Sequence, residues 1–269
     1  MSALPSIALV GAGRMGSALA SGWLSGKGKR DIRIAEPTAG ETVQAWAAAG
    51  KVQLNPEPSP VEVLVVAVKP QVFPKVADSM KPWIGPETLV VSIMAGTRIK
   101  QLSERLGTDR VIRVMPNTPG AIGKGVSVMS ALPTITVADI SITRTLLEPL
   151  GEVVGPVDEK HMSVVTGLSG SGPAYVFLLA EAMTDAAIAE GLPADIAAQL
   201  SRLTVEGAAA LMAQSEEAPD ALRKAVTSPG GTTQAALDIL MDEGGMPGLM
   251  RKAIRAAANR DRELSRDTD

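Results

Sequence analysis

Residues 6–16 read Ser-Ile-Ala-Leu-Val-Gly-Ala-Gly-Arg-Met-Gly, an apolar run followed by three glycines in the spacing G-x-G-x-x-G. The pattern predicts a strand over Ser6–Val10 and a helix over Met15–Ser25, joined by the turn that contains the glycines. The first glycine suits the tight turn, the second lets a pyrophosphate approach the backbone, and the third lets the helix pack closely on the strand. A merely tight turn also carries glycines, but the position at the first strand of a βαβ unit favours dinucleotide binding.

The rest of the first half alternates short β-branched runs with segments whose apolar residues recur at helical spacing. Such alternation is typical of an α/β domain, in which a parallel sheet is flanked by helices. Further strands are expected over Ile32–Glu36, Val63–Val68, Leu89–Ile93, Val111–Met115, Gly125–Met129 and Glu152–Val157. Connecting helices are expected over Gly40–Ala49, Val72–Met80, Ile99–Leu106 and Ala138–Leu150. The sequence therefore predicts a Rossmann-type parallel sheet domain over residues 1–157.

The second half changes in texture after Val157, where β-branched runs become rare and Ala- and Leu-rich helical segments follow. We therefore expect an all-α domain over residues 158–269. Pro173 suits the first turn of one helix, because a helix leaves that N–H unpaired in any case. Small residues crowd the stretch from Ala180 to Ala213, which indicates close helix packing and a subunit interface. Other helices are expected over Ala194–Ala213, Asp220–Ala225, Thr232–Asp242 and Met246–Leu264.

The composition excludes several classes of function. The 269-residue chain has a formal net charge of −3, three Trp, two Phe, one Tyr, one His and no Cys. Without a basic patch or a stacking platform, nucleic acid is not an expected partner. Without cysteine, and with His161 alone, neither a disulfide nor a zinc site of the usual ligands is expected, and we predict no metal.

Two apolar stretches bear on location. Met1–Leu24 is apolar but lacks a basic start and contains Arg14, so it does not match a secretory signal. The longest strongly apolar run elsewhere, Val63–Val68, is far shorter than the ~20 residues that span a bilayer. We expect a cytoplasmic protein with no membrane partner.

Glu36 ends the second predicted strand, 20 residues after Gly16. An acidic side chain at this position accepts hydrogen bonds from the adenosine ribose hydroxyls and repels a phosphate there, which favours NAD over NADP. The positive charges of Arg14 and Lys69 could compensate for that repulsion. The alternative is that Glu36 is only a solvated strand end.

Other loops fall at the carboxyl ends of predicted strands, the edge where ligands bind in this architecture. Val68-Lys69-Pro70 and Ala95-Gly96 follow two of these strands and are candidates for contact with the cofactor. The rigid loop Met115–Pro119 follows a third strand and contains Asn117. Asn117 either lies near a nicotinamide or simply terminates the strand.

The second half contains a pattern typical of an anion site. Thr227-Ser-Pro-Gly-Gly-Thr-Thr233 comes directly before a helical pattern, so free N–H groups and threonine hydroxyls converge where a substrate carboxylate would fit. Gly167–Tyr175 is rich in Gly and Ser before Pro173, which indicates hydroxyls and free N–H groups at a helix start and favours a site wall over a simple cap. Glu159 and Glu216, taken alone, are more typical of solvated carboxylates.

These motifs together resemble the pyrroline-5-carboxylate reductase family over nearly the whole chain. The shared motifs are Gly11–Gly16, Ala67–Pro70, Met115–Pro119, Thr166–Tyr175 and Thr227–Thr233. The resemblance implies reduction of the cyclic imine L-1-pyrroline-5-carboxylate to L-proline by NAD(P)H, the last step of proline biosynthesis. It also implies a Rossmann domain joined to a helical domain that forms a homodimer, often within a larger ring.

The resemblance further implies roles for individual residues. Cofactor contacts fall on Val10, Gly11, Ala12, Gly13, Arg14, Met15, Glu36, Ala67, Val68, Lys69, Pro70, Ala95, Gly96 and Asn117. Substrate contacts fall on Glu159, Ser171, Gly230, Gly231, Thr232 and Thr233, with the Thr233 hydroxyl near the ring nitrogen as the catalytic group. Two positions depart from the family: Glu36 replaces a serine that meets the 2′-phosphate in some members, and Ala225 replaces an asparagine near the substrate.

Two other readings compete with this one. A β-hydroxyacid dehydrogenase also joins a Rossmann domain to a helical one, but it needs a catalytic lysine in the first long helix of the second half, and Tyr175–Leu192 contains none. A nucleotide sensor without turnover is expected to have lost the Gly-Gly-Thr-Thr pocket, which is intact here. A reductase of this kind also needs little histidine. A cyclic imine is readily protonated in solution, so the enzyme has mainly to orient it and does not depend on a side-chain acid.

Overall fold

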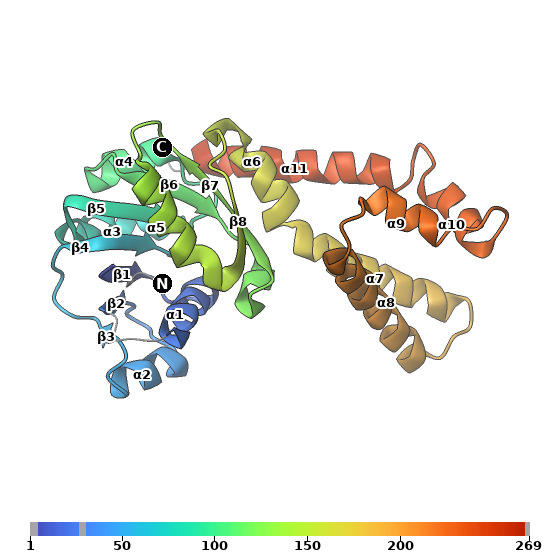
Figure 1. Cartoon of the computed structure of the whole chain (residues 1–269), viewed down its shortest axis with the longest axis horizontal. Helices are drawn as coiled ribbons and strands as arrows, with labels where there is room; N and C mark the ends of the chain where they lie inside the picture. The colour runs from blue at the N-terminus through green and yellow to red at the C-terminus, as the bar shows by residue number, and fades with distance from the viewer. Residues whose placement is uncertain (1–4, 27–30, 267–269) are drawn as a thin grey trace. The chain divides into compact units, whose positions relative to one another are not determined.

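The computed structural model describes residues 5–26 and 31–266. Within them, the first half of the chain is built around one sheet of eight strands. The strand order is β3-β2-β1-β4-β5-β6-β7-β8 (Figure 1). The strands are β1 Ile7–Val10, β2 Ile32–Ala35, β3 Gln53–Leu54, β4 Val61–Val66, β5 Ile84–Ser92, β6 Val111–Met115, β7 Gly125–Ala131 and β8 Gly151–Val154. The order reverses between β1 and β4, which is the point where this architecture binds nucleotides.

The sheet is mostly parallel, as predicted, but β7 pairs antiparallel with β6, and β8 runs parallel to β7. The connection from β6 to β7 contains only the short 3₁₀ turn Thr118–Ile122. A parallel return needs a crossover of a dozen or more residues, so a link of this length imposes a reversal. The sequence pattern missed β3, and it placed the start of β5 at Leu89, because Gly85 and Pro86 interrupt the β-branched run.

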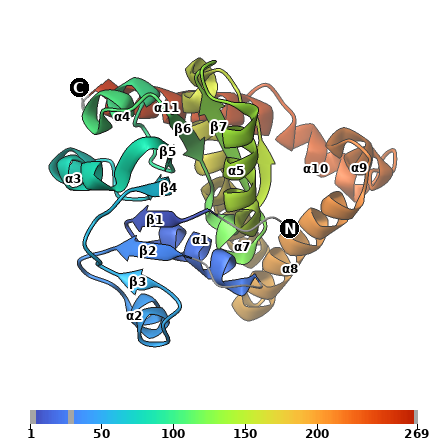
Figure 2. The same ribbon diagram turned by 60° about the vertical axis from the view of Figure 1, so that its left-hand side comes forward.

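Helices cover both faces of the sheet, and alternate residues of each strand face opposite cores. On β1, Ile7 and Leu9 pack with helices α1 (Arg14–Ser25), α2 (Glu41–Ala48) and α5 (Val137–Leu147). Ala8 and Val10 pack with helices α3 (Phe73–Met80) and α4 (Ile99–Leu106). Figure 2 shows α3 and α4 on the side of the sheet away from α1 and α5.

The chain divides into two compact units. The first comprises residues up to Gly170 together with Ala256–Asp269, and the second comprises Ser171–Arg255. The C-terminal segment from Ala256 thus belongs to the unit that contains the sheet. The predicted division at Val157 assigns this segment to the helical domain instead. No sequence pattern signals this arrangement, because it depends on contacts between residues far apart in the chain.

The second unit is helical, as predicted. Helices α7 (Gly172–Ala189) and α8 (Ala194–Gln214) pack side by side, and α9 (Pro219–Ala225) and α10 (Thr232–Leu240) follow. The last helix, α11 (Met246–Arg266), begins in this unit and ends in the first one. Large apolar side chains of α7 and α8 face solvent in the single chain, including Phe177 at 69% and Leu178 at 61% exposure. An exposed apolar surface of this kind marks an interaction site.

Helix α7 begins at Gly172 with Pro173 in its first turn, as predicted, but the Gly- and Ser-rich stretch before it is a π-helical turn, which the sequence did not predict. Helix α6 (Met162–Val165) continues into a π-helical turn over Thr166–Gly170, directly before α7. Ser171 separates the π turn from α7 and is the N-cap of that helix. Among the described residues, the run Glu159–Ala189 is long and apolar enough to cross a membrane by length and composition, a test that the core helix of a soluble protein also passes.

Candidate active site

The glycine loop after β1 shows three different steric environments. A Cβ at Gly11, whose φ is +94°, would lie 2.8 Å from the carbonyl carbon of Ala67, and a Cβ at Gly16 would lie 2.3 Å from the carbonyl oxygen of Gly11. A Cβ at Gly13 would meet no described atom within 4 Å, apart from its chain neighbours. Gly11 and Gly16 are therefore required by packing, whereas Gly13 keeps open the space through which a pyrophosphate approaches the backbone. The loop fits a dinucleotide.

The Glu36 carboxylate lies beside this loop. One of its oxygens accepts the Ala12 N–H at 2.9 Å, and the other accepts the N–H and hydroxyl of Thr38, both at 3.1 Å. Burial raises the pKa of Glu36, but the hydrogen bonds from Ala12 and Thr38 outweigh it and hold the pKa below its usual value. Glu36 is therefore a charged acceptor at neutral pH, at the end of β2 where an adenosine ribose binds in this fold.

The segments after β4 and β5 end at the same edge of the sheet as the glycine loop, because these three strands are parallel neighbours. The Ala67 N–H donates to the Val10 carbonyl at 2.8 Å, and the Lys69 carbonyl accepts the N–H groups that begin α3. Lys69 is exposed and Val68 and Pro70 are half-buried. After β5, Gly96 is buried and adopts a φ of +68°. The predicted cofactor residues 10–15, 36, 67–70, 95 and 96 are therefore gathered along one edge.

Asn117 mainly fastens its own loop. Its Oδ1 accepts the Val126 N–H at 2.9 Å, and its Nδ2 donates to the Ser169 hydroxyl at 3.5 Å. The amide thus connects the turn after β6 both to β7 and to the π turn. This arrangement favours the reading of Asn117 as a strand terminator, and its contact with a cofactor stays a prediction.

The predicted carboxylate turn lies in the second unit. The Gly231 N–H donates to the Ser228 carbonyl at 3.0 Å, with Pro229 and Gly230 between them and a φ of +69° at Gly230. Proline followed by a residue of positive φ is typical of a type II turn. Gly231 is then the N-cap of α10 and has no side-chain cap, so the first N–H groups of α10 are left for a ligand.

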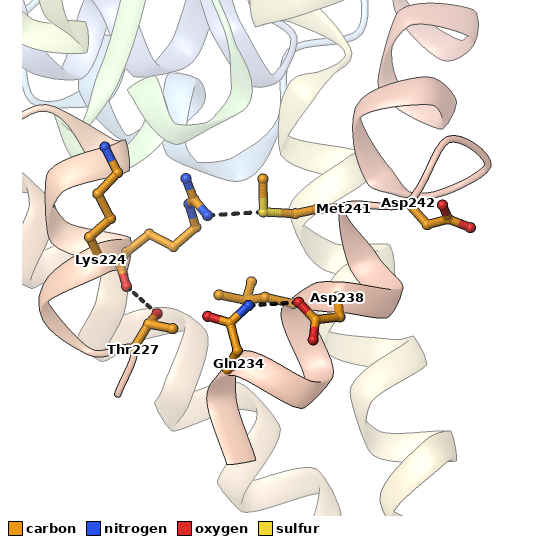
Figure 3. Close-up of a pocket in the computed structure, with 8 residues that line it drawn as sticks. Lys224, Thr227, Gln234, Asp238, Met241 and Asp242 are labelled. Carbon is orange, nitrogen blue, oxygen red and sulfur yellow. Dashed lines mark hydrogen bonds between the residues drawn. The ribbon is translucent and has the colours of Figure 1, made fainter. Parts of the chain in front are cut away.

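A cavity of about 480 Å³ lies between α9 and α10, next to this turn in sequence (Figure 3). The Gln234 amide donates to Asp238 at 2.6 Å, and the Arg223 guanidinium lies 2.9 Å from the sulfur of Met241. Gly230–Thr233 do not line it, and sequence reasoning did not single it out. The lining residues are Arg223, Lys224, Thr227, Gln234, Leu237, Asp238, Met241 and Asp242.

Glu159 and Ser171, the remaining predicted substrate residues, lie on either side of the unit boundary. Glu159 Oε1 accepts the Ile99 N–H at 2.7 Å and lies 3.4 Å from the Arg113 guanidinium, so its contacts are within the first unit. Ser171 directly follows the π turn and is half-buried. Sequence reasoning missed Arg113, because nothing in a strand pattern distinguishes a buried arginine from an edge residue.

The sheet order, the open glycine loop and the charged residue after β2 define a Rossmann-type nucleotide-binding protein with a helical partner unit. Residues 6–96 match the family model described as NADP oxidoreductase coenzyme F420-dependent, and residues 159–264 match the model described as pyrroline-5-carboxylate reductase dimerisation.

Full-length relatives agree with the family models. The pyrroline-5-carboxylate reductase of Pseudomonas aeruginosa is 38% identical, with 97% of both chains covered. A solved pyrroline-5-carboxylate reductase from Coxiella burnetii has a TM-score of 0.88 at 30% identity, covering 97% of this chain and 98% of that one. A structure of the Plasmodium falciparum enzyme with NADP bound has a TM-score of 0.79 at 26% identity, covering 97% and 98%. The chain belongs to the pyrroline-5-carboxylate reductase family and is an oxidoreductase.

Proposed function

We propose that the protein reduces L-1-pyrroline-5-carboxylate to L-proline by hydride transfer from NAD(P)H, as the last step of proline biosynthesis. One observation carries the proposal: a single chain of this family combines an open glycine loop after β1 with an uncapped turn before α10. The first feature suits a dinucleotide and the second suits the carboxylate of a small acid.

The cofactor contacts are assigned to the edge of the sheet. In the loop Val10–Met15, the Gly11 N–H is engaged by Ala35 and the Ala12 N–H by Glu36. The N–H groups of Gly13, Arg14 and Met15 therefore hold the pyrophosphate, where Gly13 leaves room for it. Glu36 accepts hydrogen bonds from the adenosine ribose, and its charge favours NADH over NADPH. The segments Ala67–Pro70 and Ala95–Gly96 line the nicotinamide half, with Asn117 beyond them.

The substrate contacts are assigned mainly to the turn before α10. The N–H groups of Thr232 and Thr233 bind the carboxylate at the positive end of the helix, since the Gly231 N–H is engaged by the Ser228 carbonyl. The Thr233 hydroxyl lies near the ring nitrogen and holds its proton. Ser171 and Glu159 complete the predicted set, the latter through Oε2, because its Oε1 is engaged by Ile99 and Arg113.

The chemistry asks little of side-chain acids and bases. A cyclic imine is readily protonated in water, so the reacting species is an electrophilic iminium. When bound, NAD(P)H would supply a hydride to the iminium carbon, and the products would be L-proline and the oxidised cofactor. The residues of this chain provide orientation, which lowers the barrier by removing translational and rotational freedom beforehand.

The assembly is proposed to be a cytoplasmic homodimer formed through the helical region 158–269, with a larger ring as its higher form. Exposed apolar residues of α7 and α8 support the dimer, and so does the match of residues 159–264 to a dimerisation model. Contact with a second subunit, rather than with a membrane, is the proposed reason for the apolar character of the run Glu159–Ala189.

Isotope transfer tests the proposed reaction. With NADH deuterated at the transferred position, mass spectrometry of the product should show L-proline with one deuterium, in a one-to-one ratio with NAD formed. A sample without enzyme is the control, because the imine is itself reactive. Formation of NAD without labelled proline would refute the reaction.

A further inference from the structure

A buried arginine in β6 has no place in the mechanism described above. The Arg113 side chain is 3% exposed, and its guanidinium faces two carboxylates, Glu159 at 3.4 Å and Asp261 at 3.9 Å. Asp261 is equally buried, at 4% exposure, while Glu159 is 31% exposed. Buried charges are costly unless paired, so this group is expected to hold parts of the protein together.

The three charged residues come from elements far apart in the sequence. Arg113 is in β6, and Asp261 is in the part of α11 that belongs to the first unit. Glu159 Oε1 also accepts the N–H of Ile99, the first residue of α4. Arg113 therefore joins the end of α11 to the start of α4 within one compact unit.

The end of α11 also contacts the loop after β5 directly. A Cβ at Gly96 would lie 3.7 Å from Leu264 Cβ and from Ser265 Oγ, and 3.9 Å from Asp261 Oδ1. The Gln101 amide donates to the Ser265 carbonyl at 2.9 Å, and its oxygen accepts the Arg98 N–H at 2.8 Å. Figures 1 and 2 show the end of α11 beside α4. The segment 256–265 thus forms one wall of the loop Ala95–Thr97.

The ion pair that anchors this wall is incompletely satisfied. Arg113 Nε and Nη2, Asp261 Oδ2 and the nearby Thr97 Oγ1 have no hydrogen-bond partner within the described residues. The attraction between Arg113 and Asp261 is therefore mainly Coulombic, and each charge depends on the other for compensation in a dry environment. Neutralising one partner should loosen the wall without opening a cavity, because no side-chain volume is lost.

We propose that Arg113 and Asp261 are positioning residues that fix the end of α11 against the loop Ala95–Thr97 and so set the affinity for the cofactor. The inference rests on the proposed function, which assigns Ala95 and Gly96 to the nicotinamide half of the site. A loop that is already held in its bound conformation costs less to order on binding, so the loss of its support weakens binding. The C-terminal segment is thereby part of the cofactor site without touching the cofactor.

The test compares Asp261→Asn with a control variant of a second buried aspartate, Asp139 in α5. Asp139 is also buried and pairs with Arg110 at 2.7 Å, directly before β6 begins. Asp261→Asn should raise the Kd for NADH, measured by fluorescence titration, roughly threefold to thirtyfold, with kcat changed by less than about twofold. Asp139→Asn should lower the melting temperature and leave the Kd unchanged. Equal Kd values for Asp261→Asn and the wild type would overturn the proposal.

If Asp261→Asn does not fold, amide hydrogen exchange of the wild-type protein tests the same proposal. Saturating NADH should slow amide hydrogen exchange in residues 256–265 as well as in the loop Ala95–Thr97. Protection of the loop alone would overturn the positioning role. A wild-type protein that binds neither NADH nor NADPH would instead overturn the proposed function, and this inference with it.

Discussion

Substitution by alanine is expected to have different effects at Gly13 and Gly16: it should weaken cofactor binding at Gly13 and lower stability at Gly16. In Gly16→Ala, the new Cβ would lie 2.3 Å from the Gly11 carbonyl oxygen, a backbone atom that moves only with the loop. Overpacking of this kind costs about 1–3 kcal/mol, and the better helix propensity of Ala returns at most ~1 kcal/mol. We expect a net loss of about 1–2 kcal/mol, which lowers the melting temperature by roughly 2–8 °C in a chain of this size.

In Gly13→Ala, the new methyl group meets no described atom within 4 Å, and the φ of −66° is accessible to alanine. Stability should therefore stay within about 1 kcal/mol of the wild type, since the gain from a stiffer unfolded chain offsets a slightly worse N-cap. The methyl group does occupy the approach of the pyrophosphate, so the Kd for NADH should rise at least about tenfold.

Thermal unfolding followed by circular dichroism and fluorescence titration with NADH measure the two quantities separately. Gly40→Ala is the matched control, because Gly40 is also an uncapped helix N-cap, with a φ of −68° and an open Cβ direction. It should change neither quantity appreciably. Wild-type NADH affinity in Gly13→Ala, or wild-type stability in Gly16→Ala, would refute the steric reasoning.

Further predictions concern the charged and hydroxyl groups. Glu36→Gln should raise kcat/KM with NADPH relative to NADH by about fivefold to thirtyfold, since a carboxylate ~4 Å from a dianionic phosphate in a largely solvated site costs about 1–2 kcal/mol. Glu41→Gln is the control, and an unchanged ratio would contradict the role of Glu36. The pKa of Glu36 is lower in the folded protein than its ordinary value of 4.5. The free energy of unfolding of the wild type should therefore exceed that of Glu36→Gln by a full, constant amount above pH 4.5, and this difference should disappear as the pH falls through the folded pKa. Urea titrations at several pH values measure the difference. Thr233→Ala should lower kcat/KM about tenfold to a hundredfold with unchanged NADH affinity, whereas Thr184→Ala, whose hydroxyl bonds within α7, should be neutral; a matching loss of NADH affinity would show that Thr233 is misplaced.

Local signals predicted much of this molecule. The apolar runs around Leu9, Val65 and Ile112 identify buried strands, because both faces of a central strand are covered and the residues are apolar throughout. The glycine spacing likewise predicted the loop after β1, since each glycine has a steric reason that acts within a few residues. The turn at Pro229 and Gly230 has the same local character.

What the sequence did not predict depends on distant partners. The reversed direction of β7 follows from the length of the link that precedes it, not from the composition of the strand. The π turn over Thr166–Gly170 was not predicted, although α7 begins beside Pro173 as expected, since glycines permit a turn without requiring one. The pairing of Arg113 with Asp261 joins residues on β6 and α11, and neither residue carries a signal of its partner.

Steady-state kinetics with pyrroline-5-carboxylate measure the proposed reaction itself. The loss of NADH absorbance, and separately of NADPH absorbance, gives kcat/KM for each cofactor at saturating imine. We expect imine-dependent turnover with both cofactors and a higher kcat/KM with NADH. Absence of imine-dependent turnover with either cofactor, in a protein that binds NADH, would contradict it.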